Sequence, residues 1–241
     1  MKRLIVVLLT LLSSSVLFAQ SPLDELRKKI EEATTSRNSS LSNDKLVTGL
    51  KEALRVGTGN AVAETGRPDG FLKNAAIKIL LPDKLRTAGK TMRMVGMGSQ
   101  VDALEVGMNR AAEQAAPKAK AIFLDALTRM TFTDARQIFS GGDTAATEYF
   151  KRQSSDQLTA AFAPIVHNAM ENVGVVRQYN KVLQNPLAAP IKNDKEFDLD
   201  NYVVGKTMDG LFYMLGQEEK KIRTDPAAQI TPILREVFGK K

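Results

Sequence analysis

Thr131-Phe-Thr-Asp-Ala-Arg-Gln-Ile-Phe-Ser-Gly-Gly-Asp-Thr-Ala-Ala-Thr-Glu-Tyr-Phe150 is the stretch that decides the fold. It predicts two helices that meet at a corner formed by Gly141-Gly142-Asp143. Thr131 and Asp134 have the spacing of a capping box, in which a hydroxyl residue and an acid three positions later cap a helix start. The same spacing occurs at two further places, Ser99 with Asp102 and Ser154 with Gln157. These signals predict a helical fold and no particular reaction.

Working outward, apolar residues recur at intervals of three and four, and Gly or Pro interrupts the runs. One buried stripe is especially regular: Val101, Leu104, Met108, Ala111, Ala112 and Ala115. The polar segment 34–42 separates two earlier helices. We therefore predict an all-α, single-domain bundle of eight to ten helices, with one short extended segment near Ile77–Leu81.

The N-terminus has the form of a secretory signal peptide. Lys2 and Arg3 precede an apolar run, and small residues lead to a cleavage site after Ala19. The apolar run is too short for a membrane span, so we expect no transmembrane segment after cleavage. The pattern predicts a signal peptide at 1–19 and a periplasmic or secreted helical domain at 20–241, in which 20–42 forms a loosely docked arm.

The composition excludes several kinds of chemistry. The 241-residue chain has no Cys, which removes disulfides, thiol catalysis and thiolate metal sites. It carries a formal charge of +7, but its basic residues are spread among acids, so nothing demands an anionic polymer as partner. Because Trp is absent and aromatics are few, stacking platforms for bases are poorly supplied and we expect no specific nucleic-acid binding.

One polar flank accompanies the regular stripe. Its members are Asp102, Glu105, Asn109 and Glu113. Oxygen ligands at this spacing can converge on a metal ion, but no His lies nearby in sequence, and a solvated acidic face is the simpler interpretation. We therefore predict no metal site and no cofactor.

The Gly141–Asp143 corner exposes backbone amides at a helix start, an arrangement that can hold an anion. Asp143 is itself placed to accept those N–H groups as an N-cap, which favours a structural role. His167 is the only His, and the helical wheel of a long helix from 156 to about 179 puts it on the polar face. A single exposed His does not support a catalytic triad or a multi-His metal site.

The last long helix follows Asp200, which we interpret as its N-cap. Its apolar stripe consists of Val204, Met208, Leu211, Phe212, Leu215 and Ile222. We expect Glu219 and Arg223 to pair outside this stripe, and Tyr213 to point away from it, where it could meet a partner or a ligand. The apolar residues of 230–238 predict that the C-terminus docks on the domain.

Several segments resemble a family of exported bacterial proteins catalogued as domain of unknown function four-one-nine-seven. They are Met108-Asn-Arg-Ala-Ala-Glu-Gln-Ala-Ala-Pro-Lys-Ala, Ser140-Gly-Gly-Asp-Thr-Ala-Ala-Thr-Glu-Tyr-Phe, Asp209-Gly-Leu-Phe-Tyr-Met and Glu218-Glu-Lys-Lys-Ile-Arg. The resemblance runs over nearly all of the chain after residue 19. It implies an exported, mainly helical protein from a Gram-negative bacterium, and it brings no catalytic residue.

These observations favour a binding protein over an enzyme. The expected partner is a protein, or a small hydrophobic or anionic ligand, at the cell envelope. The residues predicted to bind it combine polar groups with Ala-rich helix faces: Asn109, Arg110, Glu113, Asp143, Thr147, Tyr149 and Arg152. We predict no catalytic residue.

Two other functions stay open. One is a hydrolase or lyase that uses a carboxylate pair, with Glu105 and Glu113, or Asp198 and Asp200, as candidates. The other is a carrier of lipid or of another hydrophobic ligand, suggested by the positive charge and by nine Met residues, whose flexible side chains suit apolar cavities.

Overall fold

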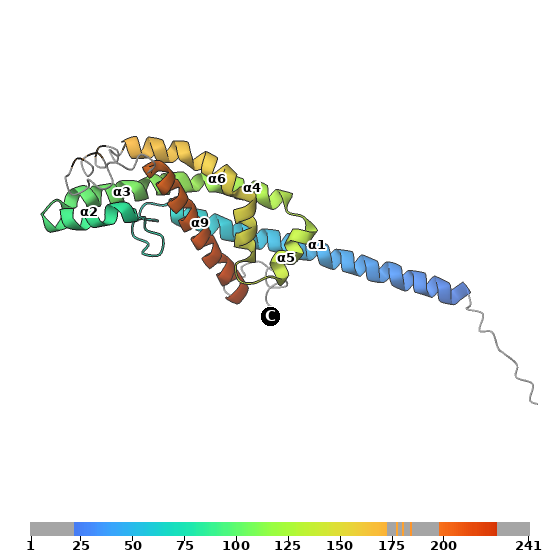
Figure 1. Cartoon of the computed structure of the whole chain (residues 1–241). Coiled ribbons are helices and arrows are strands. Elements are labelled where there is room, and N and C mark those ends of the chain that lie inside the picture. The colour runs from blue at the N-terminus through green and yellow to red at the C-terminus, as the bar shows by residue number, and fades with distance from the viewer. Residues whose placement is uncertain (1–21, 173–176, 178–179, 181–183, 185–197, 226–241) are drawn as a thin grey trace, which may run out of the picture. The chain divides into compact units, whose positions relative to one another are not determined.

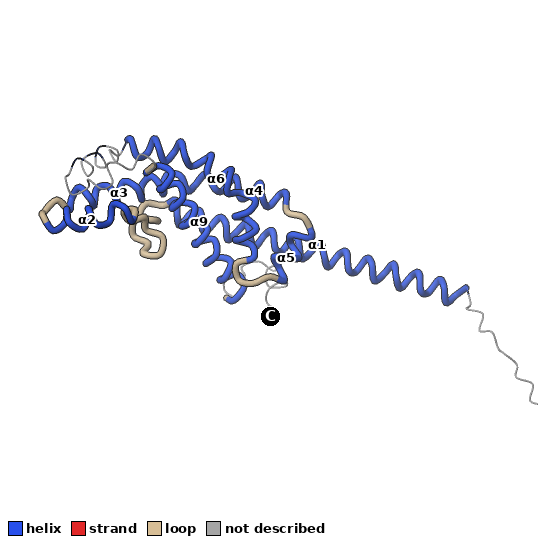
Figure 2. Tube along the Cα trace, viewed as in Figure 1, coloured by secondary structure: helices blue, strands red, loops and turns tan. Residues whose placement is uncertain are grey.

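The computed structural model describes residues 22–172, 177, 180, 184 and 198–225. This part of the chain is all-helical, with turns and loops but no strand (Figures 1 and 2). Its helices are α1 (Pro22–Gly66), α2 (Asp83–Met94), α3 (Gly98–Ala115), the 3-10 turn η1 (Ala116–Lys118), α4 (Ala119–Arg129), α5 (Phe132–Ser140), α6 (Ala145–Asn172) and α9 (Leu199–Thr224). The predicted all-α class is confirmed, but the described residues form fewer α-helices than the eight to ten predicted.

Two predicted helix starts do not exist, which accounts for part of the difference. Helix α1 continues through 34–42, where we predicted a break. That segment contains neither Gly nor Pro, and its Ser, Thr and Asn residues each cost only roughly 0.7 kcal/mol or less relative to Ala in a helix. Helix α6 likewise continues through Ser154, whose hydroxyl donates to the carbonyl of Phe150 over 2.5 Å instead of capping a helix start.

The chain divides into two compact units, residues 1–42 and 43–241. Of the first unit, the structure describes only the helical backbone of 22–42. The predicted signal peptide at 1–19 and the predicted docking of 230–238 lie outside the described residues.

Within residues 43–241, α3 lies in the core. Its predicted apolar stripe is confirmed, since every member of that stripe is fully buried. Helices α6 and α9 pack against each other and against α3. Three aromatic rings from α4, α6 and α9 meet here, with Phe123 lying 5.1 Å from Phe150 and 6.1 Å from Phe212 between ring centroids. Such aromatic packing adds to the stabilisation from burial of apolar area.

The quoted stretch around Gly141 folds largely as predicted. Thr131 and Asp134 form a capping box at the start of α5, with both reciprocal hydrogen bonds in place. The corner separates α5 from α6. The expected box at Ser99 is wrong: α3 begins at Gly98 without a side-chain cap, because the carboxylate of Asp102 binds Arg93 at 2.8 Å instead.

Candidate functional site

Helix α3 turns its polar flank toward the segment 67–82, which connects α1 and α2. Asn109 is fully buried there. Its side-chain oxygen accepts a hydrogen bond from the backbone N–H of Ile79 at 2.9 Å, and its side-chain nitrogen donates to the carbonyl of Ile79 at 2.8 Å. The Asn109 amide thus satisfies both the N–H and the C=O of Ile79, which a neighbouring strand would do in a sheet. The predicted extended segment near Ile77–Leu81 is not part of a strand. Instead, the Asn109 side chain makes hydrogen bonds to the backbone of its residue Ile79.

Glu113 holds the other end of the same connection. One carboxylate oxygen accepts the backbone N–H groups of Phe71 and Leu72, each at 3.1 Å. The other oxygen accepts from Arg110 at 2.6 Å, and Arg110 also donates to Asp69 at 2.6 Å. The hydrogen bonds to Glu113 and Asp69 raise the pKa of the Arg110 guanidinium above its ordinary value.

Glu105 completes this row, which we call the polar ladder: Glu105, Asn109, Arg110 and Glu113. Glu105 accepts the backbone N–H of Leu81 at 3.4 Å and lies 3.3 Å from the guanidinium of Arg93. The prediction of a solvated acidic face is therefore wrong for these α3 residues, except for Asp102, which is exposed. The reason is that the connection has no helix or sheet to satisfy its backbone N–H groups, and buried N–H groups need a partner.

The ladder fixes one wall of a hollow of about 360 Å³, which we call the α9 hollow. It is lined by Ala76, Ile77, Lys78, Leu80, Leu81, Arg86, Tyr202, Lys206, Asp209, Gly210 and Tyr213. Helix α9 comes close to the connection here because Gly210 has no side chain: a Cβ at this position would lie 2.5 Å from the ring of Phe71. The size falls within the range of small-ligand sites, about 300–1,000 Å³.

Positive groups predominate in the α9 hollow. Lys78 comes from the connection, Arg86 from α2 and Lys206 from α9. Asp209 is the acid among the lining residues, and Lys206 binds it at 3.0 Å. That hydrogen bond raises the pKa of the Lys206 ammonium, so this lysine stays charged at neutral pH. Arg86 also pairs with Asp83 in the first turn of α2.

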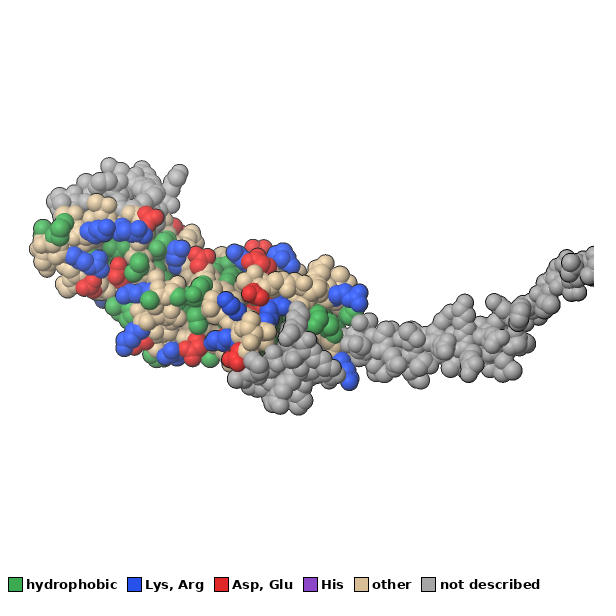
Figure 3. All heavy atoms as spheres, turned by 90° about the horizontal axis from the view of Figure 1, so that it is seen from below, with side chains coloured by type: hydrophobic (Ala, Val, Ile, Leu, Met, Phe, Trp, Pro, Cys, Tyr) green, Lys and Arg blue, Asp and Glu red, His purple; other side chains and the backbone are tan. Residues whose placement is uncertain are grey.

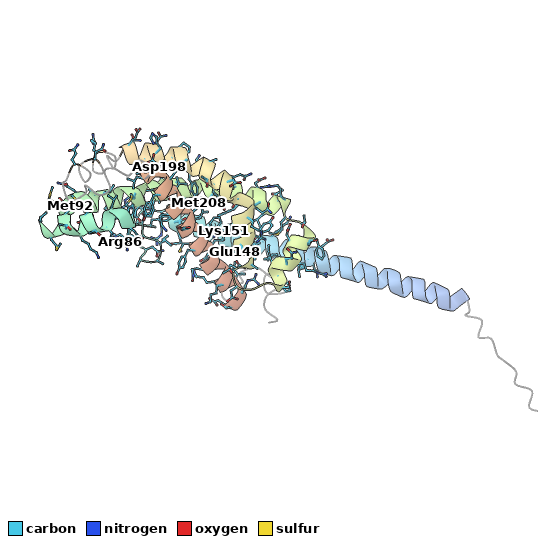
Figure 4. All side chains as sticks on the ribbon, viewed as in Figure 1. Arg86, Met92, Glu148, Lys151, Asp198 and Met208 are labelled. Atoms are coloured by element: carbon cyan, nitrogen blue, oxygen red, sulfur yellow. The ribbon has the colours of Figure 1, made fainter. Side chains whose placement is uncertain are left out.

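Two tyrosines stand beside these cations. The hydroxyl of Tyr202 donates to the carbonyl of Leu80 at 3.0 Å, and burial raises its pKa. Tyr213 is 46% exposed, as its predicted direction away from the apolar stripe requires. Its ring also lines a neighbouring hollow of about 380 Å³ on the side of α6, so it separates the two. In Figure 4, Arg86 of the α9 hollow lies well apart from Glu148, which lines the neighbouring one.

The structure does not gather the predicted site residues into one site. Asn109, Arg110 and Glu113 lie together in the polar ladder and bind protein groups. Of the four predicted on α6 and its corner, Asp143 and Thr147 line the neighbouring hollow. Tyr149 is buried and donates its hydroxyl to the carbonyl of Ala126 at 3.0 Å, and Arg152 is exposed. Sequence periodicity could not separate these roles, because it reveals which face a residue occupies but not what covers that face.

A residue that we did not predict caps α6. Glu219 of α9 accepts the backbone N–H groups of Ala146 and Thr147 at 2.9 and 2.8 Å. Asp143, the predicted cap, is exposed. Glu219 and Arg223 pair as expected, at 2.8 Å, but the pair is buried and not outside the stripe. The burial of Glu219 could have been predicted from its spacing, since it lies four residues after Leu215 and three before Ile222, on the face of the apolar stripe.

The remaining candidate groups also have structural partners. His167 is exposed as predicted, and its Nδ1 lies 2.7 Å from Asp200. Asp200 was predicted to cap α9, but Asp198 does so by accepting the N–H of Asn201. The carboxylate pairs considered for a hydrolase line neither the α9 hollow nor the neighbouring hollow beside α6. Within residues 22–172 and 198–225, no three or more acid or His side chains are grouped to hold a metal.

Another concavity is an open groove of about 750 Å³ between α1 and α4. Its lining is mainly apolar, with Leu124 and Leu127 on the α4 side. On the α1 side Arg55 makes two hydrogen bonds to Glu52 at 2.8 and 2.9 Å, and Lys51 is the other charged residue of the lining. Outside the Arg55–Glu52 pair, this groove therefore offers a single cation from its lining, whereas three cations line the α9 hollow.

None of the helices in the described ranges has the length and apolar character needed to cross a bilayer. A comparison with protein families matches residues 40–239 to the model described as "Protein of unknown function (DUF4197)". Neither the curated proteins nor the solved structures contain a match. The family match covers the polar ladder, the α9 hollow and the Glu219 cap, so these features lie inside the family's domain. The chain belongs to the DUF4197 family of proteins of unknown function.

Proposed function

We propose that this protein is exported to the periplasm and binds a small anionic ligand in the α9 hollow. The observation that carries the proposal is the convergence of Lys78, Arg86 and Lys206 on one hollow of ligand size. These cations come from three separate segments, and one acid, Asp209, accompanies them in the lining. Charge-assisted hydrogen bonds from such groups are the strong contacts to carboxylates and phosphates.

The polar ladder supports the same proposal. Lys78 is adjacent to Ile79, whose backbone is held at both its N–H and its C=O by Asn109. Because this segment of the lining is already ordered before a ligand binds, less binding free energy is lost to conformational entropy. Tyr202, anchored on Leu80, fixes the connection to α9 as well.

The export part of the proposal rests on residues 1–19. Their basic tip, apolar run and Ala19 follow the order of a secretory signal. Sequencing of the N-terminus of protein from an osmotic-shock fraction tests it: a chain that begins at Gln20 supports export. An uncleaved chain found in the cytosolic fraction contradicts it.

The two rival functions have less support. A carboxylate-based hydrolase would need its acids in a cleft, whereas Glu105 and Glu113 are occupied by backbone N–H groups and guanidinium groups. A lipid carrier would need an enclosed apolar cavity, whereas the mainly apolar concavity between α1 and α4 is an open groove. The α9 hollow combines concavity with three cations, of which Lys206 also pairs with Asp209 and Arg86 with Asp83.

The ligand test uses citrate and inorganic phosphate as probes. Thermal unfolding is followed with each probe and with sodium chloride at equal ionic strength, for the wild type and for Lys206→Met and Lys78→Met. We expect the probes to raise the unfolding temperature of the wild type, because binding to the native state stabilises it, and to lose this effect in both variants. Lys120→Met, an exposed change on α4, is the matched control and keeps the effect.

Native mass spectrometry of protein purified from its own periplasm complements this test. A retained small anion that is lost in Lys206→Met supports the proposal. Equal stabilisation of wild type and Lys206→Met by both probes contradicts it, since the anions would then act elsewhere on the surface.

A further inference from the structure

The corner between α2 and α3 carries the most exposed large apolar side chains of the described residues. Met94 is 78% exposed and Val95 60% exposed. They are adjacent at the end of α2, where Gly96 (φ 83°) reverses the chain. The N–H of Met97 donates to the carbonyl of Met92 at 2.8 Å and closes the turn. The two side chains are therefore held outward by an ordered turn.

A row of cations on α2 leads to this apolar tip. Arg86, Lys90 and Met94 are spaced four residues apart, so they share one face of the helix. All three are exposed, while Leu85 and Met92 on the opposite face are completely buried. Figure 3 shows Lys and Arg side chains beside hydrophobic ones at the end of the molecule that carries α2 and α3.

Three acids near this row pair with Arg86 and Arg93, so Lys90 is the nearby cation that no described acid neutralises. Asp83 binds Arg86 at the start of α2, far from the tip. Asp102 of α3 binds Arg93 at 2.8 Å, and Glu105 lies 3.3 Å from the same guanidinium. The full chain has a formal charge of +7, and removal of residues 1–19 with Lys2 and Arg3 leaves +5, so a negative surface attracts the exported molecule at long range.

We propose that this corner docks on the surface of an anionic lipid bilayer, with Met94 and Val95 in the interfacial region and Lys90 at the headgroup phosphates. Apolar side chains flanked by basic residues are the composition of interfacial anchors, and juxtaposed cations add attraction to anionic lipids. The tip protrudes, whereas small-molecule sites are concave. Two apolar side chains are also few for a protein interface, which usually takes about 20–30 residues a side.

The test exploits the absence of Trp from the chain. Val95→Trp places a single fluorophore at the tip, and Leu124→Trp places one at another exposed apolar position, 37% exposed on α4. Both proteins are titrated with vesicles of phosphatidylcholine alone and of phosphatidylcholine mixed equally with phosphatidylglycerol. We expect a blue shift and quenching by brominated lipid for Val95→Trp on the mixed vesicles only. Leu124→Trp should show neither change.

Charge is tested in the Val95→Trp background. Lys90→Glu should weaken the vesicle titration about tenfold or more, because it replaces an attraction by a repulsion, while Lys120→Glu on α4 should leave it nearly unchanged. Both lysines are exposed, so neither change should disturb folding, which the far-ultraviolet circular dichroism spectrum verifies.

Several outcomes overturn the proposal. They are an absent shift on mixed vesicles, an equal shift for Leu124→Trp, and equal binding to uncharged vesicles. A shift caused by lipid-free periplasmic extract, but not by vesicles, would assign the tip to a protein partner and would also overturn it. Lys78 and Lys206 are untouched by these changes, so failure here leaves the proposed ligand in the α9 hollow unaffected.

Discussion

The side-chain amide of Asn109 makes two hydrogen bonds to the backbone of Ile79, thirty positions earlier in the chain, one as acceptor at 2.9 Å and one as donor at 2.8 Å. This pair connects the central helix α3 to the wall of the α9 hollow. The N–H and C=O of Ile79 are buried together with the Asn109 side chain. The connection between α1 and α2 therefore depends on a side chain for hydrogen bonds that a helix or a sheet usually supplies.

Asn109→Ala should lower the free energy of unfolding by about 2–5 kcal/mol, because it leaves two buried backbone groups without partners. Urea denaturation measures this loss, and hydrogen exchange at the Ile79 amide should speed up. Gln114→Ala, at an exposed position of the same helix, is the control and should change stability little. A loss below about 1 kcal/mol for Asn109→Ala would show that water or a shifted backbone replaces the amide.

Glu219→Ala should destabilise the protein by about 3–5 kcal/mol, since it removes the partner of a buried Arg and uncaps α6. Arg223 is only 9% exposed, and among the described residues it would keep its hydrogen bond to the carbonyl of Ile138 but no carboxylate partner. Glu148→Ala is the matched control: Glu148 is also an acid in the first turn of α6, but it is exposed, and its loss should cost about 0.3–1 kcal/mol. Equal losses in urea denaturation would contradict the assigned cap.

Two glycines of α9 should respond to Ala in opposite directions. At Gly210 a Cβ would meet the Phe71 ring at 2.5 Å, so Gly210→Ala should destabilise by about 1–3 kcal/mol through overpacking. At Gly205 an added Cβ would come within 4 Å of no other described part of the structure, so Gly205→Ala should stabilise by up to about 1 kcal/mol through helix propensity. Thermal unfolding of both variants decides the matter. A stabilising Gly210→Ala would mean that α9 can move away from the connection without loss.

His167 should titrate above its ordinary pKa of 6.5, because the hydrogen bond to Asp200 favours the protonated ring. Since this is the only His, one imidazole signal in the NMR spectrum follows it. Asp200→Asn should return the pKa toward 6.5. The stabilisation is fully present below the unfolded-state pKa and is lost as the pH rises through the raised native value.

The same pair therefore predicts a pH-dependent effect of His167→Gln. The difference in unfolding temperature between wild type and variant should be larger at pH 5.5 than at pH 8.5, values that bracket the ordinary histidine pKa of about 6.5. A difference that is the same at both pH values would show that protonation of His167 beside Asp200 does not stabilise the native state.

The helical class, the buried stripe of α3 and the capping box at Thr131 were predictable, because local signals encode them. Hydrophobic periodicity identifies a helix and its buried face, and a capping box needs residues only three positions apart. Helix boundaries were less predictable. Ser154 has the chemistry of a cap, yet the hydroxyl binds the carbonyl of Phe150 within a continuous helix. Both uses of a Ser hydroxyl are common, and burial of the surrounding apolar face decides between them.

The candidate site could be predicted only in part. Asn109, Arg110 and Glu113 were correctly grouped, but as ligand-binding residues, whereas they hold the backbone of the connection. The α9 hollow was missed except for Tyr213, because Lys206 lies more than a hundred positions after Lys78 and Arg86. Convergence of that kind leaves no periodic trace in the chain.

Periodicity and capping signals thus establish from the chain alone that this protein is helical and which stripe of α3 is buried. Tertiary packing decides which hydrogen-bond partners the polar side chains of α3 and α9 have. A polar flank is equally compatible with water and with a neighbouring backbone that lacks hydrogen-bond partners, since either satisfies its donors and acceptors. Because 67–82 packs against α3, Glu113 and Asn109 bind its backbone N–H groups. Because α6 begins beside α9, Glu219 binds the first N–H groups of α6.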